Sequence, residues 1–262
     1  MWLKLPEKTL EPASIVKQTH FSNSDELCEY ISELCEGKVI LAFSTGKDSV
    51  VSWLKLRRYF KEITPVFLYR VPGRLSFIDK ALAYYEDFFG CHIYRFPHPD
   101  LYSTIGNLVF QPPEHLDVIV EENFYMYDFE EMWAAIRSCD PENLDVSYIA
   151  EGIRSADSII RGTSIRKHGP VSHLKRQFYP IYDYKKDDIV RELEAAKVKL
   201  PYDYALFGRT FDGVDRTFTQ PIKEHFPDDY QVILDAFPLA EMDILRMKWR
   251  QEYWDHGGEV AI

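Results

Sequence analysis

The stretch Lys38-Val39-Ile40-Leu41-Ala42-Phe43-Ser44-Thr45-Gly46-Lys47-Asp48-Ser49 decides the fold of this chain. Its apolar run, residues 39–43, is typical of a short strand that is buried on both faces. A polar turn follows, and apolar residues spaced for one helix face continue from Val50 to Phe60. The sequence therefore predicts a strand, a tight turn and a helix, an arrangement that attracts anions to the helix N-terminus.

The polar residues of this turn suit a phosphate. Lys47 adds a positive charge, Ser44 and Ser49 add hydroxyl donors, and Asp48 can cap the helix or help to hold Mg²⁺. The turn is not a Walker A loop, because position 41 is not glycine and Lys47 is followed by Asp48. An ordinary strand-to-helix turn without a ligand is the alternative interpretation.

The rest of the chain continues the alternation of strands and helices. Strands are predicted at 63–69, 91–96 and 146–150, and helices at 25–36, 76–89, 129–137 and 187–196. Residues 97–127, rich in proline and aromatic residues, have no clear assignment. This order predicts an α/β fold with an open, mostly parallel twisted sheet flanked by helices.

Three parts are expected along the chain. An N-terminal arm covers residues 1–22, a nucleotide-binding domain covers 23–215, and a C-terminal helical extension, packed on that domain, covers 216–262. The packing residues expected in the tail are Leu234, Ile244, Leu245 and Trp249.

A second motif follows the predicted fourth strand: Glu151-Gly152-Ile153-Arg154-Ser155-Ala156-Asp157-Ser158-Ile159-Ile160-Arg161. Ligands of open α/β sheets bind beyond the carboxyl ends of the strands, so this motif shares a rim with residues 44–49 and 70–74. Arg154 and Arg161 are seven residues apart, which places them on one side of a helix, where they can grip an oligophosphate. A helix start with an Asp157–Arg161 ion pair is the alternative.

Together the two motifs resemble those of the phosphoadenosine-phosphosulfate (PAPS) reductase-like family, within the PP-loop ATP pyrophosphatases. That family has Phe-Ser-x-Gly-Lys-Asp-Ser in its pyrophosphate loop and Gly-x-Arg-x-x-Glu-Ser-x-x-Arg in its second motif. Here Thr45 replaces the first glycine of the superfamily loop, which the family tolerates, and Asp157 replaces the glutamate of the family's second motif. Residues 178–190 and 200–209 are similar to two further segments of the family, and the resemblance covers about residues 36–215. It implies an adenine nucleotide alpha-hydrolase-like, Rossmann-like fold.

The resemblance also implies a set of site residues. Catalysis would fall to Lys47, Asp48, Arg154 and Arg161, with Asp48 as a Mg²⁺ ligand. The nucleotide would be bound by two groups of residues, one in the loop and one on the neighbouring strand and second motif: Phe43, Ser44, Thr45, Gly46, Lys47, Asp48 and Ser49, and Leu68, Tyr69, Gly152, Arg154 and Asp157.

One departure separates this chain from the reductases of the family. They attack sulfur with a cysteine in a C-terminal segment, whereas no cysteine follows Cys139 here. Cys28, Cys35, Cys91 and Cys139 form no Cys-x2-Cys pair, so no iron–sulfur cluster is expected. The stretch from Tyr69 to Arg74 lacks the Asp-Thr-Gly that relatives often carry, so the ribose or adenine contacts are expected to differ.

Composition narrows the function further. The 262 residues carry a formal net charge of −11, which argues against a broad nucleic-acid-binding surface. A local basic cluster remains at Arg166, Lys167, Lys175 and Arg176, and it favours an anionic acceptor such as DNA or RNA. The sequence has no apolar run that would span a membrane and no apolar N-terminal core typical of a signal peptide, so a cytoplasmic protein is expected.

The favoured hypothesis is an enzyme that cleaves ATP between the α- and β-phosphates with Mg²⁺, adenylylates an acceptor and releases pyrophosphate. The acceptor, a nucleobase or a small anion, cannot be read from the sequence. Two alternatives are a thiol-dependent sulfonucleotide reductase and a non-catalytic nucleotide sensor or complex subunit. Assembly as a homo-oligomer or with a partner subunit also stays open.

Overall fold

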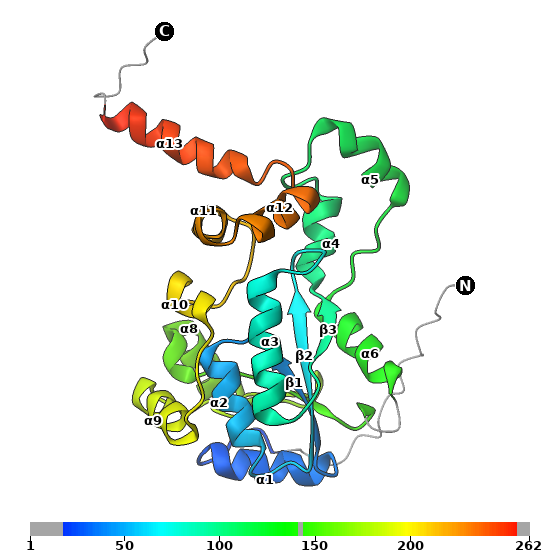
Figure 1. Cartoon of the computed structure of the whole chain (residues 1–262). Helices are drawn as coiled ribbons and strands as arrows, with labels where there is room; N and C mark the ends of the chain where they lie inside the picture. Colours follow the sequence, from blue (N-terminus) through cyan, green and yellow to red (C-terminus); the bar gives the residue numbers. More distant parts are fainter. Residues whose placement is uncertain (1–17, 141–143, 256–262) are drawn as a thin grey trace.

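The computed structural model describes residues 18–140 and 144–255. Within them one six-stranded sheet has the order β3-β2-β1-β4-β6-β5, and all neighbouring strands are parallel except the pair β5 and β6. The strands are β1 (Lys38–Phe43), β2 (Glu62–Tyr69), β3 (Tyr94–Pro97), β4 (Tyr148–Glu151), β5 (Val171–Ser172) and β6 (Gln177–Phe178). The predicted open, mostly parallel α/β sheet is confirmed (Figure 1).

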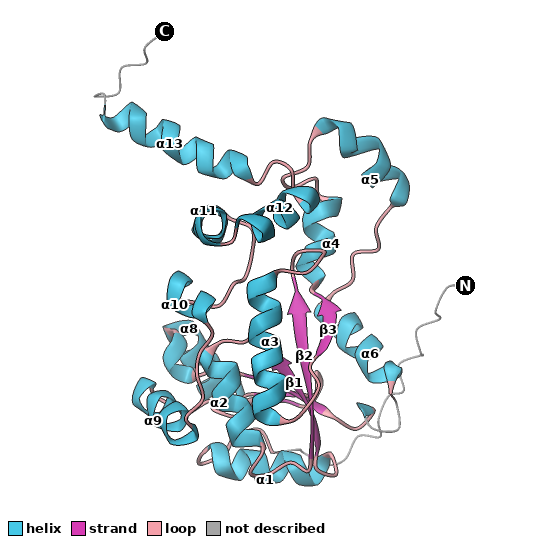
Figure 2. Cartoon of the chain, in the orientation of Figure 1, coloured by secondary structure: helices cyan, strands magenta, loops and turns pink. Residues whose placement is uncertain are grey.

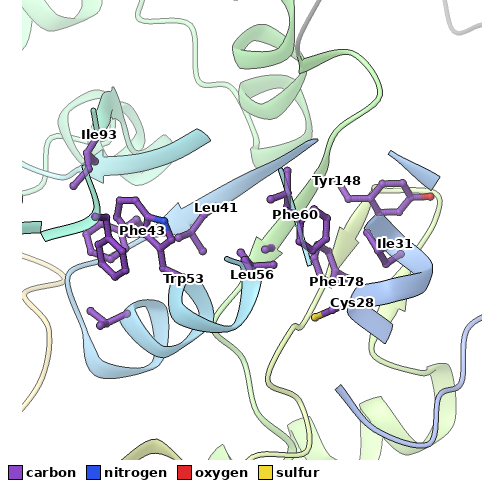
Figure 3. Packing of buried hydrophobic residues seen from close by; sticks show 14 of the residues in the cluster. Cys28, Ile31, Leu41, Phe43, Trp53, Leu56, Phe60, Ile93, Tyr148 and Phe178 are labelled. Atoms are coloured by element: carbon purple, nitrogen blue, oxygen red, sulfur yellow. The ribbon is translucent and has the colours of Figure 1, made fainter. Parts of the chain in front are cut away.

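Helices cover both faces of this sheet. The face with α1 (Ser24–Leu34), α2 (Lys47–Leu56) and α3 (Ser76–Phe89) holds the largest cluster of buried residues. In Figure 3, Leu41 and Phe43 of β1 lie beside Trp53 of α2, and the rings of Phe43 and Trp53 meet edge to face with centroids 5.1 Å apart. The opposite face packs against α6 (Phe129–Cys139) through Met132, Trp133 and Ile136. Because β1 is buried on both faces, its continuous apolar run is explained.

Local signals fix several of these helices. The side chain of Asn23 accepts hydrogen bonds from the backbone N–H groups of Asp25 and Glu26 and so caps α1. Gly90 ends α3 in the left-handed conformation, with φ 68°. Both helix ends agree with the sequence prediction to within one residue.

A second hydrophobic cluster lies beyond the carboxyl end of β2. It joins the loop before α3 to α4 (Pro99–Gly106), α11 (Arg216–His225), α12 (Pro227–Ala236) and the start of α13 (Glu241–Asp255) (Figure 2). Asp229 of α12 caps α3 from outside, because its carboxylate accepts hydrogen bonds from Ser76 N at 2.7 Å and Ser76 Oγ at 2.8 Å. The C-terminal helices therefore contact the sheet domain directly.

The structure assigns the stretch that the sequence left open, and it differs from the sequence prediction at Cys91 and Trp249. Residues 97–127 form α4, the short 3₁₀ turn Pro113–His115 and α5 (Leu116–Glu122). Strand β3 begins at Tyr94 rather than at Cys91, which lies in the turn after α3. Trp249 was expected to pack but is 58% exposed, because α13 extends away from the body and buries Ile244 instead (Figure 1). The described residues also include the 3₁₀ turn Ser155–Asp157 and the helices α8 (Ile159–His168), α9 (Lys186–Ala196) and α10 (Tyr202–Phe207).

Candidate functional site

Both sequence motifs lie at the point where the strand order of the sheet reverses. The connection from β1 runs through α2 to β2 on one side, whereas β4 lies on the other side of β1. Neighbouring parallel strands whose connections diverge leave a crevice at their carboxyl ends, the usual ligand site of open α/β sheets. Residues 44–49 follow β1 and residues 152–161 follow β4, so the fold brings the two motifs together.

Ser49 holds the loop between β1 and α2 in shape. Its hydroxyl accepts from Ser44 N at 3.2 Å and donates to Gly46 O at 2.9 Å. Gly46 is the N-cap of α2 and no side chain caps the helix, so its first N–H groups stay available to a ligand. The loop therefore presents an uncapped helix N-terminus, which favours an anion.

Thr45 adopts a backbone conformation that favours glycine. Its φ is 62°, in the left-handed region, and its hydroxyl donates to Ser44 O at 2.6 Å. The PP-loop pattern that the sequence resembles has glycine at this position. The threonine therefore keeps the glycine-like backbone of the loop, at the cost of strain for a β-branched residue.

The second motif contacts the loop through Gly152. A Cβ on Gly152 would lie 2.9 Å from the carbonyl carbon of Asp48 and 3.0 Å from Ser49 N, both backbone atoms. Only glycine permits this approach without a backbone shift. The predicted role of Gly152 in the site thus has a steric basis.

A chain of ion pairs connects the two motifs. Lys47 Nζ lies 2.8 Å from Asp48 Oδ2, and Asp48 Oδ1 lies 3.0 Å from Arg154 Nε. Arg154 Nη2 lies 2.7 Å from Asp157 Oδ1, and Asp157 Oδ2 lies 3.1 Å from Arg161 Nη1. Five of the predicted site residues thus form one alternating series of charges.

The members of this series differ in burial. The side chain of Arg154 is 10% exposed, whereas that of Arg161 is 52% exposed. Burial lowers the pKa of Lys47, but the hydrogen bond and charge of Asp48 outweigh it, so the net shift is upward and the ammonium stays charged at neutral pH. The residues that present positive charge to solvent are therefore Lys47 and Arg161, with Arg154 as a buried brace behind them.

A cavity of about 450 Å³ opens above the loop. Its walls come from the loop, from the second motif and from a third segment around α10: Ala42, Ser44, Gly46, Lys47, Asp48, Ser49, Gly152, Ile153, Arg161, Tyr204, Gly208, Arg209, Thr210 and Asp212. Arg154 and Asp157 do not line it but lie behind the lining residues. We call it the loop cavity.

The third segment was not predicted to be part of the site. A Cβ on Gly46 would lie 2.2 Å from Thr210 Oγ1, so the Thr210 hydroxyl lies directly against the loop. The similarity of residues 200–209 to a segment of the resembled family was the available signal, but it assigned no role to Arg209, and Thr210 and Asp212 lie beyond it.

Leu68 and Tyr69, predicted to bind nucleotide, line a different cavity. It has a volume of about 670 Å³ and extends from the carboxyl end of β2 along α3, with Arg70, Tyr102 and Phe211 in its wall. We call it the β2 cavity. The segment 208–212 contributes Arg209, Thr210 and Asp212 to the loop cavity and Phe211 to the β2 cavity, so the two are neighbours. The side chain of Phe43 belongs to the hydrophobic core and lines neither.

The basic cluster expected to bind an acceptor does not line the loop cavity. Lys175 and Arg176 lie in the turn before β6, at the amino end of the sheet, where Arg176 donates to Asp145 O. Lys175 pairs with Glu130 at 3.4 Å. Arg166 and Lys167 are exposed in the last turn of α8.

The residues present suit a magnesium ion bound together with phosphates. Within the described chain, Asp48 Oδ1 is buried without a hydrogen-bond partner, because its 3.0 Å contact with Arg154 Nε lacks hydrogen-bond direction. Asp48 and Asp212 both line the loop cavity, and Mg²⁺ is usually held by one or two carboxylates plus substrate phosphates. No cluster of three or more His, Cys, Asp or Glu side chains arranged for a metal occurs in residues 18–140 and 144–255.

No family model matches the chain, and no match is found among curated proteins. Solved structures do match. One is U34-tRNA thiolase NcsA from Methanococcus maripaludis, with its 4Fe–4S cluster, at 14% identity over 83% of this chain and 79% of that chain, with a TM-score of 0.42. Another is NH3-dependent NAD synthetase from Campylobacter jejuni, in complex with nitrate, at 12% identity over 84% and 93%, with a TM-score of 0.43. Matches at this level of similarity do not indicate the function of this chain, which is inferred below from its site residues alone.

Within the described residues, no helix has the length and apolar character needed to cross a bilayer.

Proposed function

We propose that the protein is a PP-loop enzyme of the PAPS reductase-like type, which binds ATP with Mg²⁺ and cleaves it between the α- and β-phosphates. The observation that carries this proposal is the convergence of an uncapped helix N-terminus, Lys47 and Arg161 on one cavity. Each of these features binds phosphate oxygen, and together they suit the oligophosphate of a nucleotide better than a single anion.

The reaction is a displacement at the α-phosphorus. A nucleophilic atom of the acceptor attacks this phosphorus, the bond to the oxygen that bridges to the β-phosphate breaks, and pyrophosphate leaves with that oxygen. A proton carried by the nucleophilic atom passes to water. Negative charge grows on the leaving pyrophosphate, and the loop N–H groups, Lys47 and Arg161 stabilise it electrostatically. Magnesium would supply further charge neutralisation at Asp48.

Arg154 has a supporting role in this proposal. It holds Asp48 in the loop and Asp157 in the second motif at the same time, at 3.0 and 2.7 Å. Asp157 in turn contacts Arg161, so the position of the exposed arginine depends on the buried one. Its positive charge behind the cavity wall adds to the attraction for phosphate.

The nucleoside is proposed to extend toward the β2 cavity. Leu68, Tyr69 and Tyr102 offer apolar and aromatic surface there, which suits a base. The acceptor is left as a nucleobase or a small anion. Arg166, Lys167, Lys175 and Arg176 are the candidates for contact with a nucleic acid, on a surface separate from the loop cavity. A sulfonucleotide reductase is disfavoured, because none of the four cysteines lines either cavity.

The test is release of pyrophosphate from ATP and Mg²⁺ in the presence of candidate acceptors, with Lys47→Ala as the comparison. We expect the variant to lose pyrophosphate release by at least 100-fold while its melting temperature stays near that of the wild type, since Lys47 is partly exposed and its ion pair with Asp48 is between neighbours. Asp48→Ala is a less clean probe, because it also removes a partner of buried Arg154. Turnover that survives Lys47→Ala would contradict the assignment.

A further inference from the structure

One wall of the loop cavity belongs to neither motif. After α10 the chain turns at Gly208 and passes over the loop, so that Arg209, Thr210 and Asp212 line the cavity. The close approach of Thr210 Oγ1 to Gly46 fixes this passage. Arg209 is therefore held at the edge of the cavity by the residue that follows it.

The guanidinium of Arg209 forms a solvent-exposed ion pair. It pairs with Asp212 three residues later, and the two side chains are 58% and 43% exposed. Exposed pairs of this kind contribute little to stability, because water and salt screen them. The guanidinium also lies over the ring of Phe218, 5.5 Å from its centroid. Phe218 is fully buried in the second cluster, so this contact keeps the arginine beside the cavity that it lines.

The two arginines of the second motif both pair with Asp157. Arg154 is buried and binds two carboxylates, and Arg161 shares Asp157 with it. Among the described residues that line the loop cavity, the basic ones are Lys47, Arg161 and Arg209. Lys47 carries a point charge at the loop and cannot make two parallel hydrogen bonds to one phosphate, whereas a guanidinium can. A second guanidinium beside Arg161 would therefore allow each phosphate of a pyrophosphate to be bound in this way.

We propose that Arg209 is a further phosphate-binding residue, which leaves Asp212 when the nucleotide binds and contacts its outer phosphates together with Arg161. This inference rests on the proposed function. It assigns recognition of the leaving pyrophosphate to the segment after α10. The exchange of partners is favourable because Arg209 gives up a screened surface pair for a charge-assisted, bidentate contact with phosphate.

Calorimetric titration with inorganic pyrophosphate, ATP and AMP tests this assignment on the full chain with Mg²⁺. Arg209→Gln should weaken binding of pyrophosphate and ATP by at least tenfold and change AMP binding by less than twofold. Arg209→Lys should recover only part of the loss, because an ammonium cannot make the forked contact. Arg191→Gln is the matched control, since Arg191 also pairs with an aspartate three residues away and is 72% exposed, but lines no part of the loop cavity.

The outcomes separate this inference from the proposed function. Wild-type binding of ATP and pyrophosphate, with Arg209→Gln within twofold of it, overturns the role of Arg209 alone. A wild-type protein that binds neither ligand overturns both proposals. Should Arg209→Gln not fold, Arg209→Lys decides: full pyrophosphate affinity contradicts the inference, and reduced affinity supports it.

Discussion

Arg154 and Asp48 lie 3.0 Å apart, Nε to Oδ1, and this contact joins the motif after β4 to the loop after β1. It forms at the point where Gly152 brings the two backbones together. Because Arg154 also binds Asp157, the two motifs are connected by one buried guanidinium. The arginines of the second motif therefore have different tasks: Arg154 braces the site and Arg161 faces the cavity.

Lysine substitutions should separate these tasks. Arg154→Lys keeps the charge but cannot reach both carboxylates, so we expect a loss of about 2 kcal/mol in the free energy of unfolding and a melting temperature about 5 °C lower. Arg161→Lys, at an exposed position, should leave the melting temperature unchanged. Both variants should lose at least tenfold in pyrophosphate release. Full activity in both would indicate that only surface charge matters at these positions.

Gly152→Ala should disable the site by steric means. The added methyl group would meet the backbone of Asp48 and Ser49 at 3.0 Å or less, so the start of α2 must move. Misplacement of about 1 Å at a catalytic site can cost about 100-fold in rate, and we expect a loss of that order in pyrophosphate release.

Gly213→Ala is the control for this variant. A Cβ there has its nearest neighbour, Asp215 Oδ2, at 4.0 Å, so the substitution meets no obstacle. We expect it to keep wild-type activity. Equal activity of the two alanine variants would show that the close approach at Gly152 is not required.

The parts of the fold that the sequence predicted are those with local causes. The apolar run of β1 and the left-handed stop of α3 at Gly90 can be read from neighbouring residues alone. Residues 97–127 could not be assigned, because α4 and α5 are short and bury few apolar side chains, Leu101 and Ile119 among them. Helical periodicity is weak where so little of a helix is buried.

In the candidate site, too, only the features with a local sequence pattern could be predicted. The loop and the second motif are each a continuous stretch of sequence, and the parallel pairing of β1 with β4 brings the two stretches together. Thr210 lies against Gly46 only because the chain returns to the loop after α10, a contact that has no local pattern. The burial of Arg154 was likewise unpredictable, since it depends on how closely β4 and α2 approach.

A buried carboxylate beside the site gives a pH dependence to the stability. Asp203 in α10 is 3% exposed, and burial raises its pKa to about 6. The ordinary pKa of aspartate is about 3.9, so between pH 4 and 6 the native state binds a proton that the unfolded state releases. The contribution of Asp203 to stability therefore falls as pH rises through this window and stays low above it.

Asp203→Asn should remove this dependence, because the amide is neutral and its oxygen can still accept the backbone hydrogen bonds. Melting temperatures measured from pH 4 to pH 8 should show the variant more stable than the wild type at pH 8, with the difference shrinking below pH 6. Asp235→Asn, at an exposed position of α12, should follow the wild type throughout. A constant difference between Asp203→Asn and the wild type across this range would contradict the assignment.

The cysteines provide the test between adenylyl transfer and reduction. Cys28 and Cys35 are fully buried, and burial raises the pKa of Cys28 to about 12 and that of Cys35 to about 11. Burial also raises the pKa of Cys91, which lies in the turn after α3 and whose thiol donates to Ile63 O, near the amino end of β2, at 3.6 Å. Cys139 is exposed at the end of α6, away from the loop cavity. Because the thiolate is the reactive form, the three buried or partly buried cysteines are poor nucleophiles.

A variant with all four cysteines changed to alanine should therefore keep its nucleotide chemistry. We expect a melting temperature a few degrees lower, since Cys28 and Cys35 fill space in the core, and pyrophosphate release within twofold of the wild type. Purified wild-type protein should also show no visible absorbance that bleaches with dithionite. Loss of turnover in a folded cysteine-free variant, or a bleachable chromophore, would replace adenylyl transfer with a redox reaction as the better explanation of this site.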